Sequence, residues 1–440
     1  MKKYLILLIF VVLVIANVKA QNPIVPPGVY IADPATHVWK DGKLYVYGST
    51  DESPNYYCSY QHDVLSTTDL KTWTITKNSF DSKGNNDKVP YNDALLFAPD
   101  VQYKNGLYYL YYCQPDNNFT EGVASSKFPL GPFTNAKPIN LYGRNQIDPA
   151  VFVDDDGQAY YIWGQFQAKM AKLKSNMTEI DSATIKDNVI TEKEHFFHEG
   201  GYMIKRNDIY YFIYTHMGRA GRPTCIGYAT SKSPMGPFEY GGVIIDNDHA
   251  DPANWNNHGS IIEFNNHWYV FYHRSTHGSN TMRKACVEPI NFNSNGSITE
   301  VEMTTQGAGD PLDAKQKIDA ERACLLYGNV RIEAIANDNE ALTQIKKGDY
   351  AGYKYIDFKE GANSVEISVT PGNSSGTVEI VLDNAWNSAI GAIKIPDNTK
   401  GNLPLQLTAK IQQASGIHAV WLRFTTNDST SFKVDWFKFK

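Results

Sequence analysis

Three carboxylic acids lie at the same distance from three similar turns, a spacing that could bring them together for acid–base chemistry. Asp33, Asp148 and Glu199 each lie eight positions before a turn residue. Those turn residues are, in the same order, Asp41, Asp156 and Asn207. Because side chains alternate along a strand, residues at one offset from matching turns occupy matching places on one face. Clustered acids are costly unless they are used, so we expect a shared pocket.

Three neighbouring carboxyl groups suit the cleavage of a glycosidic bond. One protonated carboxyl can give its proton to the leaving oxygen while an ionised one acts on the other side of the sugar, and a third carboxylate can push their pKa values apart. Glu199 is the expected donor, because its side chain is long and Gly200 and Gly201 leave room for the leaving group. Asp33 is the expected base and Asp148 the group that raises the pKa of Glu199, although spacing alone does not decide which aspartate is the base.

The elements that must position these acids are five hairpins. In each, a turn of Asn, Asp or Gly separates two apolar or aromatic runs, which is the strongest short-range signal for a β-hairpin. The turns are Asp41-Gly42, Asn105-Gly106, Asp156-Gly157, Asn207-Asp208 and Asn265-Asn266. Their period of about fifty to seventy residues is typical of propeller blades, whose first strands face a central channel. The sequence therefore predicts an all-β protein with a five-bladed β-propeller over residues 26–311.

Two further segments lie outside the predicted propeller. Residues 1–20 have two lysines before an apolar run, Leu5–Ile15, and small residues at Val18–Ala20, which is typical of a cleaved secretory signal peptide. We therefore expect a secreted or periplasmic protein. After a linker at Gly307–Pro311, short alternating runs over residues 316–440 predict a jelly-roll-like β-sandwich.

Charge and cysteine content exclude several classes of partner and cofactor. The formal net charge is −6, and removal of Lys2, Lys3 and Lys19 with the signal peptide makes it about −9, which argues against nucleic acid or an anionic membrane surface. No later apolar run suits membrane insertion. The five cysteines show no C-x-x-C pair, so a zinc site is not expected, and buried free thiols are expected, with one disulfide possible. No cofactor is expected for the chemistry itself.

Four segments carry a resemblance to a known family. They are Ile31–Pro34, Phe97–Val101, Ile147–Pro149 and His198–Gly201. In this order, together with Ser66–Trp73, they resemble the signature of glycoside hydrolase family 43 over about residues 25–290. The resemblance implies a five-bladed propeller and an inverting mechanism. It assigns Asp33 as the general base, Asp148 as the modulator of the pKa and Glu199 as the general acid.

Further residues are candidates for contact with the sugar. Trp39, Phe97 and Trp163 could stack on a sugar face, although Trp163 equally suits a core between blades. Asp100 lies only five positions before its turn, so we expect it to contact substrate or a loop and not to act as a fourth catalytic acid.

The resemblance adds two more candidates near the channel. His258 resembles a family histidine that helps to hold a calcium ion or a water cluster, and an ordinary hydrogen-bonded core histidine is the alternative. Arg274 resembles the family's arginine that reaches the bound sugar, and a surface salt bridge is the alternative.

The C-terminal segment resembles carbohydrate-binding module family 6. The residues that carry this resemblance are Ile318–Glu321, Tyr353–Phe358, Gly416–Leu422 and Asp435–Phe439. It implies that Glu321 and Asp435 share a structural calcium. Where the family has a Gly-Gly-Trp-like segment, this chain has Lys400–Leu403, and it has Lys433 in place of an asparagine. The usual cleft is therefore in doubt, and Tyr350 or Trp386 could bind sugar instead.

These features predict an inverting, exo-acting glycosidase of plant cell-wall polysaccharides or oligosaccharides. An α-L-arabinofuranosidase is favoured, then a β-xylosidase. An exo-β-galactosidase, an endo-acting arabinanase or an endo-acting xylanase of the same fold is an alternative. From another class, a non-catalytic glycan-binding propeller is kept as an alternative, because fold does not determine function. A sialidase-like enzyme would need an arginine cluster and a tyrosine nucleophile.

Overall fold

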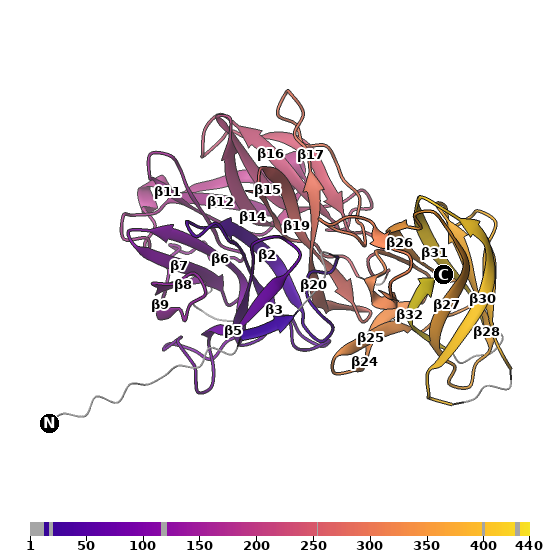
Figure 1. Ribbon diagram of the computed structural model, residues 1–440. Coiled ribbons are helices and arrows are strands. Elements are labelled where there is room, and N and C mark those ends of the chain that lie inside the picture. Colours follow the sequence, from indigo (N-terminus) through magenta and orange to yellow (C-terminus); the bar gives the residue numbers. More distant parts are fainter. Residues whose placement is uncertain (1–12, 17–20, 116–120, 253, 398–400, 427–431) are drawn as a thin grey trace.

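The structure is a computed structural model that describes residues 13–16, 21–115, 121–252, 254–397, 401–426 and 432–440. It confirms the predicted fold: a ring of five sheets is followed by a C-terminal sheet that curls on itself (Figure 1). The described helical segments are short, namely η1 (Ser182–Thr184), α1 (Glu192–His195) and η2 (Ala320–Arg322). None of the helices in these ranges has the length and apolar character that a membrane crossing requires.

Each sheet of the ring is one blade of antiparallel strands that pair in chain order, except that the first strand of blade 1 pairs with its last. Blade 1 contains β1 (Leu13–Ala16), β2 (Ile31–Val38), β3 (Leu44–Thr50), β4 (Gln61–Thr67) and β5 (Trp73–Asp81). Blade 2 contains β6 (Phe97–Lys104), β7 (Leu107–Cys113), β8 (Glu121–Ser126) and β9 (Thr134–Pro138). Blade 3 contains β10 (Ala150–Val153), β11 (Ala159–Trp163), β12 (Gln167–Lys172) and β13 (Lys186–Thr191). Blade 4 contains β14 (Phe197–Arg206), β15 (Ile209–His216), β16 (Cys225–Ser231) and β17 (Glu239–Asp246), and blade 5 contains β18 (Ser260–Phe264), β19 (His267–Thr276) and β20 (Ser279–Ile290).

The five predicted hairpin turns join the first two strands of the five blades. In blades 2, 4 and 5 the loop is two residues long, since Lys104 pairs with Leu107, Arg206 with Ile209, and Phe264 with His267. Both loop residues have positive φ in all three blades, for example 53° and 83° at Asn105-Gly106. That conformation matches the twist of the flanking strands and favours Asn and Gly, so the local sequence specifies these turns.

The ring closes where the start of the propeller lies beside blade 5. Asn22 binds Val287 twice: its amide nitrogen donates to the carbonyl oxygen at 3.0 Å, and its side-chain oxygen accepts from the backbone N–H at 2.9 Å. The N–H of Ile24 donates to the carbonyl oxygen of Ala285 at 2.9 Å. Residues 22–24 therefore run along β20 and help to join the two ends of the ring.

The innermost strands share an irregular, bulge-like corner at the channel mouth. In β2, β6 and β14 the strand register shifts where the chain leaves the mouth, at residues 32–35, 97–100 and 199–202. Asp33, Ala98, Asp148 and Gly200 have φ of 52°, 29°, 60° and 66°. Bulges of this kind re-aim a side chain and often lie beside active sites. The equivalent corners line one small cavity on the ring axis, to which blade 5 contributes His258 and Gly259.

The C-terminal domain encloses one apolar core between the two faces of its curled sheet. Its strands are β21 (Leu312–Asp313), β22 (Ile318–Asp319), β23 (Leu325–Tyr327), β24 (Arg331–Ala336), β25 (Asn339–Thr343), β26 (Tyr350–Asp357), β27 (Ala362–Thr370), β28 (Gly376–Leu382), β29 (Gly391–Ile395), β30 (Leu405–Ala414), β31 (Ile417–Thr426) and β32 (Lys433–Phe439). Large residues such as Tyr353, Phe424 and Phe437 are fully buried there. Cys324 and Leu325 of this domain pack instead against a core cluster of blades 4 and 5.

Buried polar contacts join this domain to the propeller near blades 1 and 5. Glu340 accepts a hydrogen bond from Tyr30 Oη at 2.8 Å and forms an ion pair with Lys284 at 2.5 Å. Arg331 lies 3.3 Å from Asp251. The Lys284 and Glu340 side chains are only 3% and 1% exposed, so their charges are satisfied mainly by one another.

Candidate active site

Asp33 lies at the channel mouth and is held as a carboxylate. Ser49 Oγ donates to Asp33 Oδ2 at 2.6 Å, and Arg283 Nη1 donates to Oδ1 and Oδ2 at 2.9 and 3.1 Å. Burial raises the pKa of Asp33, but the Arg283 guanidinium and then His258 outweigh it and hold that pKa well below its usual range. Asp33 is therefore ionised at any pH at which the protein works.

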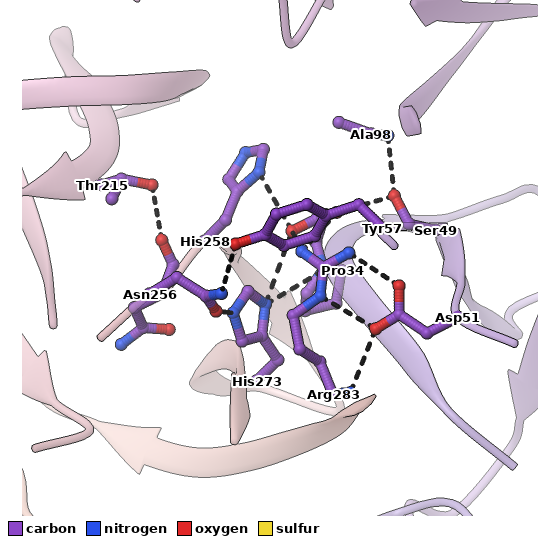
Figure 2. Close-up of polar contacts among 12 residues, drawn as sticks. Pro34, Ser49, Asp51, Tyr57, Ala98, Thr215, Asn256, His258, His273 and Arg283 are labelled. Carbon is purple, nitrogen blue, oxygen red and sulfur yellow. Dashed lines mark hydrogen bonds and ion pairs between the residues drawn. The ribbon is translucent and has the colours of Figure 1, made fainter. Parts of the chain in front are cut away.

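Arg283 bridges two buried carboxylates (Figure 2). Besides Asp33, it contacts Asp51, with Nη2 donating to Oδ1 at 2.8 Å and Nε donating to Oδ2 at 2.9 Å. The Arg283 side chain is 6% exposed and that of Asp51 is fully buried. A guanidinium has enough donors in one plane to serve both acids, so this arrangement fixes Asp33 in one orientation.

Asp148 occupies the equivalent corner of blade 3, but it lies in different surroundings. Its backbone N–H donates to Cys113 Sγ at 3.4 Å, and its carboxylate has no ion pair within 4 Å among the described residues. Burial raises the pKa of Asp148 to about 8; His258 opposes this shift, and the Glu199 and Asp33 carboxylates add to it. This carboxyl group therefore keeps a proton at neutral pH.

His258 lies between the three predicted acids. Its Nδ1 is 3.5 Å from Asp33 Oδ1. Burial lowers the pKa of His258, but a hydrogen bond with Asp33 and the charges of Asp148, Asp33 and Glu199 together raise it to about 9. A Cβ atom on Gly200 would lie 2.4 Å from the imidazole Nε2, so glycine is needed for the imidazole to sit there. The structure thus brings all three acids around one imidazole.

Glu199 is the most open of the three acids. It lies on β14 beside a register shift, and its side chain is 21% exposed. Gln165 Nε2 donates to Glu199 Oε2 at 2.7 Å, and His198 Nε2 lies 3.8 Å from the same oxygen. A neutral donor and partial access to solvent suit a group that must exchange a proton with a bound molecule.

A second histidine and a tyrosine complete the wall beside Asp33 (Figure 2). The Asp33 N–H donates to His273 Nδ1 at 3.2 Å, so that nitrogen carries no proton. Burial and the Arg283 charge lower the pKa of His273 to about 3. The Tyr57 ring lies 5.1 Å from the Arg283 guanidinium, and its hydroxyl accepts from Asn256 Nδ2 at 3.5 Å. Tyr57 is 38% exposed and faces the mouth.

Of two further candidates, Phe97 lies near this mouth and Asp100 lies below it. Phe97 is half-buried at the start of β6, next to Ala98, whose N–H donates to Ser49 Oγ at 2.7 Å. Asp100 lies deeper, where it pairs with His37 Nε2 at 2.6 Å and accepts the N–H of Val151 at 2.7 Å. Ala98 is the blade 2 equivalent of Asp33, so Asp100 braces the channel below the acids and does not face a substrate.

The structure corrects three of the expected sugar contacts. Trp39 lies just past the far end of β2, six residues after Asp33 and about 20 Å away, and stacks on His37 with ring centroids 4.8 Å apart. Trp163 is fully buried in the core between blades and donates to the carbonyl oxygen of Arg144. Arg274 is 3% exposed and bonds Tyr272 and Thr304 on the side of the C-terminal domain. Arg274 follows His273 on β19, so the two side chains point to opposite faces.

Several residues of the site were not predicted from the sequence. Arg283, Asp51, Ser49, Gln165 and Tyr57 all contact or face the acids. Arg283 had a weak signal, since two adjacent cations, Arg283 and Lys284, stand inside a strand-like run. The others lie in loops or at strand ends with no pattern of their own.

The residues expected to bind calcium give a partial fit. Glu321 is buried, its Oε2 has no hydrogen-bond partner among the described residues, and burial and Asp319 raise its pKa to about 8. Asp435 lies on β32, which pairs with β22, and accepts from Asn339 Nδ2 at 3.0 Å. However, the described part of the chain holds no group of three His, Cys, Asp or Glu side chains that could bind a metal, at His258 or elsewhere. Lys400 lies outside the described residues, as do residues 1–12 and 17–20 of the expected signal peptide.

Comparison with known proteins agrees with this geometry. The profile of glycosyl hydrolases family 43 matches residues 20–298, and the profile of the carbohydrate binding module (family 6) matches residues 319–440. A xylosidase/arabinosidase of Thermoclostridium stercorarium is 32% identical over 475 residues, which cover 94% of this chain and 97% of that protein. An arabinoxylan arabinofuranohydrolase of Bacillus subtilis (strain 168) is 27% identical and is covered to 90%, with 93% of this chain.

Two solved structures are similar in fold. A family 43 arabinoxylan arabinofuranohydrolase from Bacillus subtilis, in complex with cellotetraose, has a TM-score of 0.55 at 25% identity and covers 96% of this chain and 99% of its own. A calcium-free family 43 β-xylosidase/α-arabinofuranosidase from a compost microbial metagenome, in complex with xylotriose, has a TM-score of 0.56 at 29% identity, over 66% of this chain and 99% of its own. The chain therefore belongs to glycosyl hydrolases family 43 and carries a C-terminal carbohydrate binding module of family 6.

Proposed function

We propose that this glycoside hydrolase is an exo-acting enzyme that removes α-L-arabinofuranosyl or β-xylosyl residues from plant cell-wall polysaccharides with inversion. The observation that carries the proposal is the convergence of Asp33, Asp148 and Glu199 on the imidazole of His258. The relatives named xylosidase/arabinosidase and arabinoxylan arabinofuranohydrolase support the sugar class. Loops around the mouth decide between arabinose and xylose.

Asp33 and Glu199 have different electrostatic surroundings, as inversion requires. Arg283 keeps Asp33 ionised, so Asp33 can take a proton from a water molecule that attacks the anomeric carbon. Glu199, in contact with the neutral Gln165 and partly open, gives a proton to the leaving oxygen. When the bond breaks, the proton lost by water is on Asp33 and the leaving group has gained one from Glu199.

Asp148 affects the net charge of the site and does not contact the bond that breaks. Its carboxyl group keeps a proton at neutral pH because of burial and the two neighbouring acids. The His258 imidazolium offsets the charge that remains. In this proposal the protonated Asp148 leaves Asp33 as the carboxylate that acts on water.

Activity on small substrates tests the proposal directly. We expect turnover of 4-nitrophenyl α-L-arabinofuranoside or β-D-xyloside, release of the monosaccharide from arabinoxylan, and a first product of inverted anomeric configuration by ¹H NMR. Glu199→Gln is expected to lower kcat by about 10³-fold while binding remains, whereas Glu263→Gln, on the exposed surface of β18, is the matched control. Binding of arabinoxylan without release of sugar from any substrate would favour a glycan-binding protein.

Two further parts of the proposal concern calcium and export. Calcium at Glu321 and Asp435 would neutralise the orphaned carboxylate oxygen of Glu321 and link η2 to β32. We expect added calcium to raise the melting temperature and a chelator to lower it, with Glu321→Gln insensitive to both. For export, we expect the mature chain to begin near Gln21, which N-terminal sequencing of secreted protein would test.

A further inference from the structure

A cleft at the junction of the two domains takes no part in the proposed chemistry. Its volume is about 530 Å³, within the range of ligand sites. The propeller contributes Asp248 and His249, and the C-terminal domain contributes Leu325, Tyr327 and Lys354. Four carboxylates, those of Asp246, Asp248, Glu300 and Glu302, line it. The cleft therefore combines apolar and aromatic side chains with hydrogen-bonding groups from both domains.

A row of aromatic rings runs from this cleft onto the surface of the C-terminal domain. His249 stacks on Tyr327 with centroids 4.2 Å apart and planes inclined by 24°. Tyr327 stacks on Tyr350 at 4.5 Å and 18°, and Trp386 meets Tyr350 edge-on at 5.4 Å. Trp386 is 76% exposed. Trp386 is not isolated, because Tyr350 and Tyr327 continue the row beside it, and contiguous exposed patches mark binding sites.

The same row is connected to the active site by contacts within the propeller. Asp248 pairs with Arg222 at 3.1 Å, and the Arg222 guanidinium lies 4.9 Å from the ring of Trp255, which is 45% exposed. The next residue, Asn256, donates to the hydroxyl of Tyr57 at 3.5 Å, and Tyr57 covers Arg283 at the mouth (Figure 2). Exposed or half-exposed rings thus extend from the acids to Trp386.

We propose that this row, from Tyr57 through Trp255 and the junction cleft to Trp386, is a track that holds the backbone of a neutral polysaccharide during removal of its side sugars. The inference rests on the proposed function and deepens it. Ring faces suit the C–H faces of sugars, and the carboxylates of the cleft accept hydrogen bonds from hydroxyl groups. The net charge of −6 and the four acids of the cleft repel a polyuronate, so the backbone is uncharged.

Length is the distinguishing property of the ligand in this inference. The track crosses from one domain to the other, so only a polymer can contact Tyr57 and Trp386 at once. An aryl glycoside reaches the mouth alone. Loss of a ring far from the acids should therefore raise KM for a polymer relative to KM for an aryl glycoside.

Variants at the two exposed tryptophans test the track from both domains. Trp255→Ala and Trp386→Ala are compared with Phe128→Ala, an equally accessible ring (65% exposed) on the loop between β8 and β9 of blade 2. We expect each tryptophan variant to bind soluble arabinoxylan at least about fivefold more weakly in affinity electrophoresis, the double variant to bind more weakly still, and Phe128→Ala to match the unaltered protein. KM for arabinoxylan should rise in parallel, and polygalacturonate should not be retarded.

Three results would overturn the proposal. The first is unchanged binding of arabinoxylan in both variants. The second is weaker binding in Trp386→Ala but not in Trp255→Ala, which would restrict binding to the C-terminal domain. The third is equal retardation of the protein by polygalacturonate. If the protein hydrolyses neither aryl glycosides nor arabinoxylan, the proposed function fails, while the binding measurements still decide whether the track exists.

Discussion

The first and third blades present the same corner to the channel with opposite electrostatic results. Asp33 and Asp148 both precede a proline, both have left-handed φ, and both are buried to a similar degree. Arg283 holds the pKa of Asp33 well below its usual range, whereas burial and neighbouring acids raise the pKa of Asp148 to about 8. The same backbone corner therefore carries an ionised aspartate in blade 1 and a protonated aspartate in blade 3.

The difference arises from the partners that ring closure supplies. Arg283 belongs to blade 5 and reaches Asp33 because blade 5 closes against blade 1. Asp148, two blades away, has Cys113 beside its backbone, and the charges of His258 and, more weakly, Arg283 do not outweigh its burial. Equivalent positions in a propeller are thus equivalent in backbone alone, and the neighbouring blade decides the charge state.

Neutralising the two aspartates in turn should give the largest contrast. Asp33→Asn removes the proposed base, so we expect kcat on an aryl glycoside to fall by about 10³-fold or more at every pH. For Asp148→Asn, kcat should fall less, because Asp148 does not act on the attacking water. Steady-state kinetics on both variants, with circular dichroism to verify folding, measures this contrast. Equal losses in the two variants would contradict the division of roles.

Removing the arginine should make the first blade behave more like the third. Arg283→Gln leaves Asp51 buried without its cation and Asp33 with the His258 imidazolium alone, which we expect to cost about 3–5 kcal/mol of unfolding free energy. The depressed pKa of Asp33 contributes stability that is present above the unfolded pKa and is lost only as pH falls through the low folded value. In the variant the acidic limb of kcat/KM should move to higher pH.

Urea unfolding across pH and the pH profile of kcat/KM test this prediction together. Lys205→Gln, which removes a cation from the surface pairs with Asp154 and Asp155, is the control and should change stability little. An unchanged acidic limb in Arg283→Gln would show that Asp33 does not depend on this guanidinium.

The sequence predicted the fold because its turns are local. Asn105-Gly106 and its counterparts determine two-residue loops through φ alone, and the offset of eight residues then places the acids of blades 1, 3 and 4 at one mouth. Asp100 shows the limit of this argument. Ala98 is the corner residue of blade 2 and the equivalent of Asp33, so Asp100 lies two residues further along its strand.

The rest of the site depends on contacts between distant parts of the chain. Arg283 and Asp33 are 250 positions apart, so no local pattern could select Arg283 over Arg274. Arg274 lies one position beyond the inward-facing His273 and therefore faces the C-terminal domain. Strand direction likewise places Trp39 at the far end of β2. The alternation of side chains along β19 could have excluded Arg274 as a sugar contact, but only once one inward-facing residue of that strand was known.

The charge of Asp148 should control the alkaline side of the reaction. Since the pKa of Asp148 is raised to about 8, we expect kcat/KM of the unaltered enzyme to fall as pH rises through about that value. Asp148→Asn has no proton to lose in this range, so the alkaline limb near that pH should disappear, and kcat at pH 7 should fall by about 10²-fold. A limb that stays in place in the variant would separate Asp148 from the proton that is donated.

The smallest contrast concerns the atoms that support each aspartate. Ser49 Oγ donates to Asp33 and accepts the N–H of Ala98, so Ser49→Ala leaves a buried N–H and a carboxylate each short of a partner, at a cost of about 2 kcal/mol. Cys113 Sγ is a weak acceptor for the N–H of Asp148, so Cys113→Ala should cost about 1 kcal/mol, mainly through lost apolar contact. Urea midpoints at constant m-value measure both changes. An ionised carboxylate depends on each of its hydrogen-bond donors, whereas a protonated carboxyl group does not. Only Ser49→Ala should therefore also lower kcat, by roughly tenfold. Equal effects on kcat in the two variants would mean that Asp33 and Asp148 are supported alike.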